Sequence, residues 1–201
     1  MTQLQSYIAG RWIGSQPAQA LRSAIDGAVV AHTHDDAIDF GEALHYARTT
    51  GLAAMRKTDF QQRAGMLKAL AKYLGERKEE MYALSFHTGA TRTDGWVDIE
   101  GGTGTLFAYA SMAKELPPAG NLWHEGPQMP LGKTGAFAGT HVLVPRGGVA
   151  VHINAFNFPV WGLLEKFAPT FLAGMPCIGK PATATGFLTE KLVRLVNDSG
   201  I

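Results

Sequence analysis

The sequence is short of cysteine, of charge and of long apolar runs, and each shortage excludes a class of protein. It contains one cysteine, so neither a disulfide framework nor a cysteine-rich zinc site can form within the chain, which fits a cytoplasmic protein. A net charge of +1 gives no electrostatic reason to expect nucleic acid or an anionic membrane as a partner. No run approaches the roughly 20 apolar residues that a transmembrane helix needs, so we expect no membrane span.

What remains is the composition of a globular protein, with 201 residues of which 46% are hydrophobic. The stretch SYIAGRWIG (6–14) alternates loosely and has a glycine on either side of Arg11–Ile13, which predicts a short β-hairpin. His32 and His34 share one face of an extended segment, but without a third ligand we expect no metal site. A helical stretch follows, whose apolar members are Ile38, Ala43, Ala47 and Leu52.

The clearest helix signal begins at Thr58. Thr58 and Gln61 stand three residues apart, as in a capping box, where each side chain pairs with a backbone N–H of the first turn. Behind them, apolar residues at the helical spacing predict one buried stripe, made of Leu67, Leu70, Ala71 and Leu74. The charged run GERKEE (75–80) is typical of a solvated helix face and needs no partner.

The pattern Gly102-x-Gly104 in DIEGGTGTLFAYA (98–110) is similar to part of a dinucleotide-binding loop. A loop of that kind follows an apolar strand and carries a third glycine, which lets helix and strand pack closely. Here the preceding residues, WVDIEG, are acidic, and the third position is Phe107. We therefore interpret the small residues as the surface of a helix that packs closely against a neighbour.

The last part of the chain alternates strands and helices, after a proline- and glycine-rich connection over 115–133. Strand signals lie at 140–145, 148–153 and 175–181, and helix signals lie at 160–172 and 185–201. Gly174 stands where a C-terminal capping glycine ends the first of these helices. The order strand, helix, strand, helix from residue 148 onward predicts an α/β fold with a βαβα unit of a parallel sheet.

Polar residues follow both strands of this unit. The segment Asn154–Pro159 comes directly after the first strand, and Lys180–Thr185 comes after the second. In a doubly wound sheet, ligands bind beyond the carboxyl ends of the strands. One segment offers carboxamides and a helix N-terminus, and the other offers an ammonium group and hydroxyls. Together they predict a dinucleotide cradle that uses no glycine-rich loop.

The stretch INAFNFPVWGLLEKFAPTFLAGMPCIGKPATAT (153–185) resembles the aldehyde dehydrogenase superfamily, with its Asn-Phe-Pro turn, its Lys-x-Ala-Pro helix and its Gly-Lys-Pro segment. LSFHTGATRTDGWVDIEGGTGTLFAYAS (84–111) and VHINAFNFP (151–159) resemble, more narrowly, the dehydrogenase part of the bifunctional phenylacetate-degradation family. That family joins an oxepin-CoA hydrolase to a 3-oxo-5,6-dehydrosuberyl-CoA semialdehyde dehydrogenase. The 3,4-dehydroadipyl-CoA semialdehyde dehydrogenases of the benzoyl-CoA pathway are similar, with a slightly poorer match.

The resemblance implies an aldehyde-dehydrogenase-like, Rossmann-type parallel sheet that is incomplete in this sequence. Residues 1–139 would supply the N-terminal hairpin, helices and an oligomerisation region, and residues 140–201 would supply the start of the βαβα unit. In the family, the nucleophilic cysteine, the general-base glutamate and a Gly-x-x-x-x-Gly cofactor turn lie well beyond Gly-Lys-Pro. We therefore expect the catalytic domain to lie outside this sequence. Cys177 lies in an apolar strand and is expected to be a structural thiol, not the nucleophile.

The resemblance also assigns a catalytic position. Asn157 matches the asparagine whose carboxamide N–H stabilises the oxyanion that forms when the cysteine attacks the aldehyde. The alternative for Asn157 is a turn or cap residue, because Pro159 suits the first turn of a helix. Glu165 and Lys166 are expected to pair with each other on the helix surface.

The cofactor-binding positions implied by the resemblance are Ile153, Asn154, Ala155, Phe156, Lys180 and Thr183. Lys180 matches the lysine that bonds the adenosine ribose. Thr183 stands where NAD-preferring members often carry a glutamate, and the missing negative charge favours NADP, with NAD left open. Asn154 is either a wall of the cofactor site or a cap on the end of the strand.

The activity implied by the resemblance is oxidation of a CoA-linked semialdehyde to its acid by NAD(P)+, in phenylacetate catabolism, by a homo-oligomer. The alternative from another class is a non-catalytic nucleotide-binding or assembly module. This alternative stays open because no nucleophile or general base can be assigned within the sequence.

Overall fold

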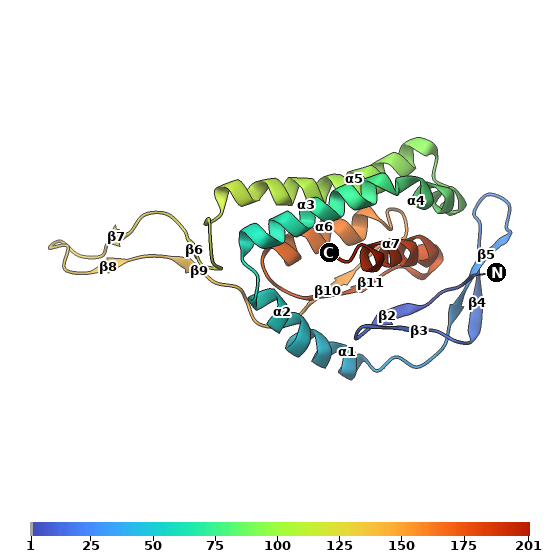
Figure 1. The fold of residues 1–201 in the computed structure, drawn as a ribbon, viewed down its shortest axis with the longest axis horizontal. Coiled ribbons are helices and arrows are strands. Elements are labelled where there is room, and N and C mark those ends of the chain that lie inside the picture. Colours follow the sequence, from blue (N-terminus) through green and yellow to red (C-terminus); the bar gives the residue numbers. More distant parts are fainter. Residues whose placement is uncertain (1) are drawn as a thin grey trace.

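Residues 2–201 are described by a computed structural model of the chain (Figure 1). Its helices are α1 (Phe40–Tyr46), α2 (Leu52–Arg56), α3 (Phe60–Glu76), α4 (Lys78–Ser85), α5 (Arg92–Met112), α6 (Trp161–Leu172) and α7 (Gly186–Asp198). Its strands are β1 (Thr2–Gln3), β2 (Ser6–Ile8), β3 (Arg11–Ile13), β4 (Pro17–Arg22), β5 (Val29–His34), β6 (Trp123–His124), β7 (Met129–Pro130), β8 (Ala138–Gly139), β9 (Val142–Leu143), β10 (Ala150–Ile153) and β11 (Cys177–Lys180). None of the helices described is both long enough and apolar enough to cross a bilayer.

Three helices form the centre of the molecule. α3 and α6 both pack against the long helix α5, and α6 also contacts β10 and β11. The buried stripe predicted on α3 is confirmed, and it comprises Leu67, Leu70, Ala71 and Leu74. The close helix approach predicted for the glycine-rich segment is also confirmed, since a Cβ added to Gly102 would lie 3.1 Å from the Trp161 Cα. These glycines lie inside α5, so they form no phosphate-binding loop.

The helix α6 connects two parallel strands. β10 pairs with β11 in a register that places Ala150 opposite Cys177 and Ile153 opposite Lys180. The Asn154 N–H donates to the Lys180 carbonyl at 3.1 Å, so the pairing continues one residue beyond β10. With α7 after β11, the predicted βαβα unit is confirmed. Because the strands are parallel, the segments that follow them leave the sheet at the same edge.

The N-terminal part of the chain forms two small sheets. β2 and β3 pair antiparallel, which confirms the hairpin predicted over 6–14. β5 lies between β1 and β4 in a three-stranded sheet. The helix predicted next is divided into α1, a π-helical turn at Ala47–Gly51 and α2, and Ile38 precedes it.

The connection between α5 and β10 leaves the body of the molecule as a long extension, here called the projecting hairpin (residues 122–144; Figure 1). β6 pairs with β9 and β7 pairs with β8, both antiparallel. The strand signal at 140–145 belongs to this hairpin, because its residues pair with β6 and not with β10. Its exposed apolar side chains are Leu122, Trp123, Met129, Leu131, Phe137, Val142, Leu143 and Val144.

The start of α3 corrects one prediction by a single residue. The capping box is made by Asp59 and Gln62, not by Thr58 and Gln61. The Asp59 carboxylate accepts from the Gln62 N–H at 2.8 Å, and Gln62 Oε1 accepts from the Asp59 N–H at 2.9 Å. Gln61 instead donates to the Ala113 carbonyl at 2.7 Å. The sequence TDFQQ contains both pairs at the same spacing, so the local pattern alone could not choose between them.

Candidate functional site at the carboxyl ends of β10 and β11

The turn NAFNFP (154–159) connects β10 to α6. Asn157 is exposed, and its side chain makes no hydrogen bond within residues 2–201, whereas Pro159 and Val160 behind it are buried. The Asn157 carboxamide is therefore solvent-exposed, while the end of the turn is packed into the core.

A buried acid on α5 holds the helix end of this turn. Asp98 is 3% exposed, and its Oδ1 accepts from the Val160 N–H at 3.0 Å and from the Trp161 N–H at 2.7 Å. α6 has no capping side chain of its own, so Asp98 caps it from a different helix. Burial raises the pKa of Asp98 to about 6, against the lowering effect of the two backbone hydrogen bonds.

Two threonines hold the carbonyl side of the same turn. Thr185 Oγ1 donates to the Phe156 carbonyl at 3.0 Å, and Thr189 Oγ1 lies 3.4 Å from the Pro159 carbonyl. Thr185 ends the short helical turn after β11, and Thr189 lies in α7. The residues directly after the NAFNFP turn are thus tied to α5 through their N–H groups, and the turn's own carbonyl groups are tied to Thr185 and to α7.

The predicted cofactor residues gather at this edge. Ile153 is 71% exposed and lies opposite Lys180 in the strand register. Phe156 is 64% exposed, and Ala155, Lys180 and Thr183 are exposed as well. Within residues 2–201 the Lys180 ammonium group makes no salt bridge. An apolar surface with a cation and a hydroxyl beside it suits a ligand that has both ring and polar parts.

Asn154 differs from its neighbours, because its side chain faces the interior. It is 6% exposed, and within residues 2–201 neither its Oδ1 nor its Nδ2 has a hydrogen-bond partner. His152 lies two residues earlier on the same buried face, with its Nε2 3.1 Å from Thr170 Oγ1. Burial lowers the pKa of His152, and the nearby charge of Lys166 lowers it further.

Comparison with known proteins shows which family has a sequence pattern that includes this edge of the sheet. Residues 12–201 match the aldehyde dehydrogenase family. The chain belongs to the aldehyde dehydrogenase family. The match includes both strand ends and the Asn157 turn, so the resemblance read from the sequence motifs is confirmed for the family as a whole.

One relative aligns with almost the whole chain. It is 42% identical over 200 residues to a 3,4-dehydroadipyl-CoA semialdehyde dehydrogenase from Aromatoleum evansii, covering 98% of the chain and 39% of that protein. The chain therefore spans about two fifths of the length of this curated relative.

Solved structures of low sequence identity share the fold. A 1-pyrroline-5-carboxylate dehydrogenase from Thermus with bound NAD has a TM-score of 0.76 at 19% identity, covering 100% of this chain and 37% of that chain. An NADP-dependent enzyme from E. coli has a TM-score of 0.74 at 19% identity, covering 100% of this chain and 40% of that chain. These likenesses support the α/β fold class of this aldehyde dehydrogenase family member.

Cys177 does not have the environment of a reactive thiol. Burial raises the pKa of its thiol to about 11, so the reactive thiolate is disfavoured.

Glu165 and Lys166 form the expected surface ion pair, with Lys166 Nζ 2.7 Å from Glu165 Oε1. Across residues 2–201, no group of three or more histidine, cysteine, aspartate or glutamate side chains is arranged to hold a metal ion.

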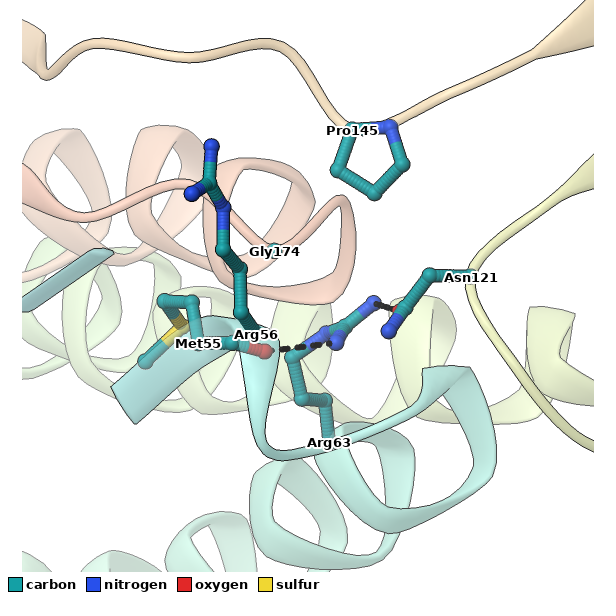
Figure 2. Close-up of a pocket in the computed structure, with 6 residues that line it drawn as sticks. All are labelled: Met55, Arg56, Arg63, Asn121, Pro145 and Gly174. Carbon is teal, nitrogen blue, oxygen red and sulfur yellow. Dashed lines mark hydrogen bonds between the residues drawn. The ribbon is translucent and has the colours of Figure 1, made fainter. Parts of the chain in front are cut away.

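A cavity of about 220 Å³ lies at the other end of α6 (Figure 2). Its lining residues are Met55, Arg56, Arg63, Asn121, Pro145 and Gly174. Arg63 is fully buried and donates to the Leu172 carbonyl at 2.9 Å and to Asn121 Oδ1 at 2.8 Å, so its guanidinium joins α3, α6 and the loop before β6. Because α6 separates this cavity from Asn157 by 12 residues, roughly 18 Å of helix, it is not part of the site at the strand ends.

Sequence reasoning missed Asp98 and Arg63, although the helical period marks both. Arg63 lies four residues before Leu67, on the buried stripe of α3. Asp98 lies beside Ile99 on the stripe that buries Gly102 and Leu106. A charged residue at a buried helical position is the signal that could have found them, because such a group needs a specific polar partner.

Proposed function

We propose that this chain is the N-terminal part of an NAD(P)-dependent aldehyde dehydrogenase that oxidises a CoA-linked semialdehyde to its acid in the catabolism of aromatic compounds. The observation that carries the proposal is the exposed Asn157 on a turn held by Asp98 and Thr185, at the same strand edge as Lys180. In this proposal the cofactor-binding unit begins at β10, because residues 140–144 pair within the projecting hairpin. The catalytic cysteine and glutamate belong to the catalytic domain outside these 201 residues.

Asn157 is proposed to act as the oxyanion donor. When a thiolate attacks an aldehyde carbon, negative charge develops on the carbonyl oxygen, and a fixed N–H donor stabilises it because the donor need not reorganise during the reaction. A carboxamide on a turn anchored at both ends meets that requirement. Loss of one such donor typically costs about 3–4 kcal/mol of transition-state stabilisation.

The strand edge fits the adenosine half of a nicotinamide dinucleotide. Lys180 and Thr183 would hold the ribose, Ile153 and Phe156 would offer apolar contact, and Asn154 and Ala155 would line the site with their backbone. Thr183 carries no negative charge that would repel a 2′-phosphate, so NADP is the proposed cofactor and NAD the second choice. When bound, the nicotinamide accepts the hydride that leaves the substrate carbon.

The substrate is proposed to be a CoA-linked semialdehyde produced by ring cleavage. The sequence motifs favour the phenylacetate route and a bifunctional protein, with 3-oxo-5,6-dehydrosuberyl-CoA semialdehyde as the substrate. The relative from Aromatoleum evansii at 42% identity instead supports the alternative, 3,4-dehydroadipyl-CoA semialdehyde. Steady-state rates of the full-length protein with the two compounds distinguish the routes, and activity with neither would refute the proposed substrate class.

The test of the site is Asn157→Ala in the full-length protein. Turnover is expected to fall roughly 10²–10³-fold, while the KM for the cofactor changes little, because the donor acts on charge that exists only in the transition state. Asn197→Ala, at an exposed asparagine near the far end of α7, is the matched control and should leave turnover unchanged. Unchanged turnover in Asn157→Ala would reduce Asn157 to a turn residue and overturn the proposed role.

Two further properties belong to the proposal. The projecting hairpin exposes apolar side chains on an extension that the body of the chain does not cover, which supports a homo-oligomer formed through this segment. Light scattering of the full-length protein tests this assembly. A cytoplasmic location is proposed from the use of a single cysteine.

A further inference from the structure

We propose that Asp98 is a positioning residue, which sets the place and orientation of the Asn157 carboxamide through the helix N-terminus that it caps. This inference rests on the proposed function, in which Asn157 is the oxyanion donor. Asp98 itself lies inside the helical layer, 3% exposed, and contacts the start of α6 directly after the turn.

The geometry gives Asp98 control over this turn. Val160 is only three residues beyond Asn157, and the first N–H groups of α6 have no partner within their own helix. One carboxylate oxygen accepts from two of them, at 3.0 Å and 2.7 Å. Those two bonds define where α6 begins relative to α5, and therefore where the NAFNFP turn ends.

The packing around Asp98 makes this anchor rigid. One turn further along α5, Gly102 meets the Trp161 backbone so closely that an added Cβ would lie 3.2 Å from the Trp161 nitrogen. On the opposite side of the turn, Thr185 holds the Phe156 carbonyl at 3.0 Å. The turn is thus held on both sides, and within residues 2–201 Asp98 supplies the side-chain hydrogen bonds to the Val160 and Trp161 N–H groups directly after it.

The chemistry of the contact suits a positioning role. Burying a carboxylate without a cationic partner is costly, and among the described residues its hydrogen-bond partners are backbone N–H groups at a helix N-terminus. An asparagine at the same position keeps one acceptor oxygen at the same distance and loses the charge, whereas alanine loses both hydrogen bonds. The two variants therefore separate hydrogen bonding from charge.

The experiment uses the full-length protein and a double-mutant cycle. Asp98→Ala is expected to lower turnover about 10- to 100-fold with little change in cofactor KM, because a displacement of about 1 Å at a reacting group has that effect. Asp98→Asn is expected to restore turnover to within about threefold. In an Asn157→Ala background, Asp98→Ala is expected to cost less than about twofold, because the group that it positions is gone.

Two readouts separate positioning from general destabilisation. Amide hydrogen exchange at Val160 and Trp161 should quicken in Asp98→Ala and stay slow in Asp98→Asn. Asp59→Ala, which removes the carboxylate cap of α3, is the matched control and should leave turnover of the folded enzyme unchanged. If Asp98→Ala does not fold, Asp98→Glu takes its place, since the extra methylene displaces the carboxylate and should reproduce the loss.

Several outcomes overturn the inference. Full turnover in folded Asp98→Ala would do so, as would an equal loss in the wild-type and Asn157→Ala backgrounds. If Asn157→Ala alone leaves turnover unchanged, the proposed function fails instead, and the inference fails with it. If instead Asn157→Ala lowers turnover and Asp98→Ala does not, only the role of Asp98 is overturned.

Discussion

Replacing Gly102 by alanine probes how closely α5 and α6 must approach to keep the Asn157 turn in place. The added Cβ would lie 3.1 Å from the Trp161 Cα and 3.2 Å from the Trp161 nitrogen, and both are backbone atoms. That nitrogen also donates to Asp98 at 2.7 Å, so it cannot withdraw without lengthening a hydrogen bond. The substitution must therefore push the two helices apart.

Two opposing effects set the magnitude. Alanine in place of glycine favours a helix interior by roughly 1 kcal/mol. Overpacking of a closely packed contact costs about 1–3 kcal/mol. Gly104 lies on the same helix with nothing within 4 Å of an added Cβ, so Gly104→Ala carries only the first effect. We therefore expect Gly104→Ala to be up to about 1 kcal/mol more stable than the wild type, and Gly102→Ala to lie about 1–3 kcal/mol below Gly104→Ala.

The assay is denaturant unfolding of the full-length protein with both variants and the wild type, followed by turnover per folded molecule. Gly102→Ala should also lower turnover, because displacement of the start of α6 moves the Asn157 turn. Equal stability and equal turnover of the two alanine variants would contradict this prediction. That result would mean that the contact between α5 and α6 yields without cost and does not determine the position of the turn.

Three further predictions concern buried charge and the cofactor edge. Burial raises the pKa of Asp98 from 3.8 to about 6, so the folded protein holds this proton more tightly than the unfolded chain does. The resulting contribution to the free energy of unfolding is complete below pH 3.8 and is lost as the pH rises through 6. Between about pH 4.5 and 7, unfolding experiments should show the wild type losing about 2 kcal/mol relative to Asp98→Asn, and parallel pH profiles would contradict this. Thr183→Glu should shift the ratio of kcat/KM toward NAD+ by about tenfold or more, and an unchanged ratio would exclude Thr183 as the discriminating residue. Arg63→Met should lower the free energy of unfolding by at least about 3 kcal/mol, since each buried oxygen left without a donor costs about 1–3 kcal/mol; a thermal midpoint equal to the wild type would contradict it.

Elements that depend on short-range patterns were predictable from the sequence. The spacing of Leu67, Leu70 and Leu74 identified the buried face of α3, and the glycines around Arg11–Ile13 identified the first hairpin. The alternation of apolar strands and helices after residue 148 predicted the βαβα unit, and the site segments at its strand ends followed from it. These features depend on local backbone geometry and on which face of an element is buried. The spacing of apolar residues along the chain therefore indicates them.

Features that depend on partners far along the chain could not be predicted from local patterns. The strand signal near Val142 was real, but its partner is Trp123–His124 in the projecting hairpin, and strand pairing over such a distance is not encoded in the period of either strand. The capping residue of α3 is Asp59 and not the predicted Thr58, because both residues have the same sequence spacing and only the packing of the folded chain selects between them. Asp98 meets Val160 across 62 residues of chain, so only the crossing of α5 and α6 brings that carboxylate to the helix end it caps. That an asparagine follows the strand can be read from the chain, but the groups that hold its turn in place come together only in the folded protein.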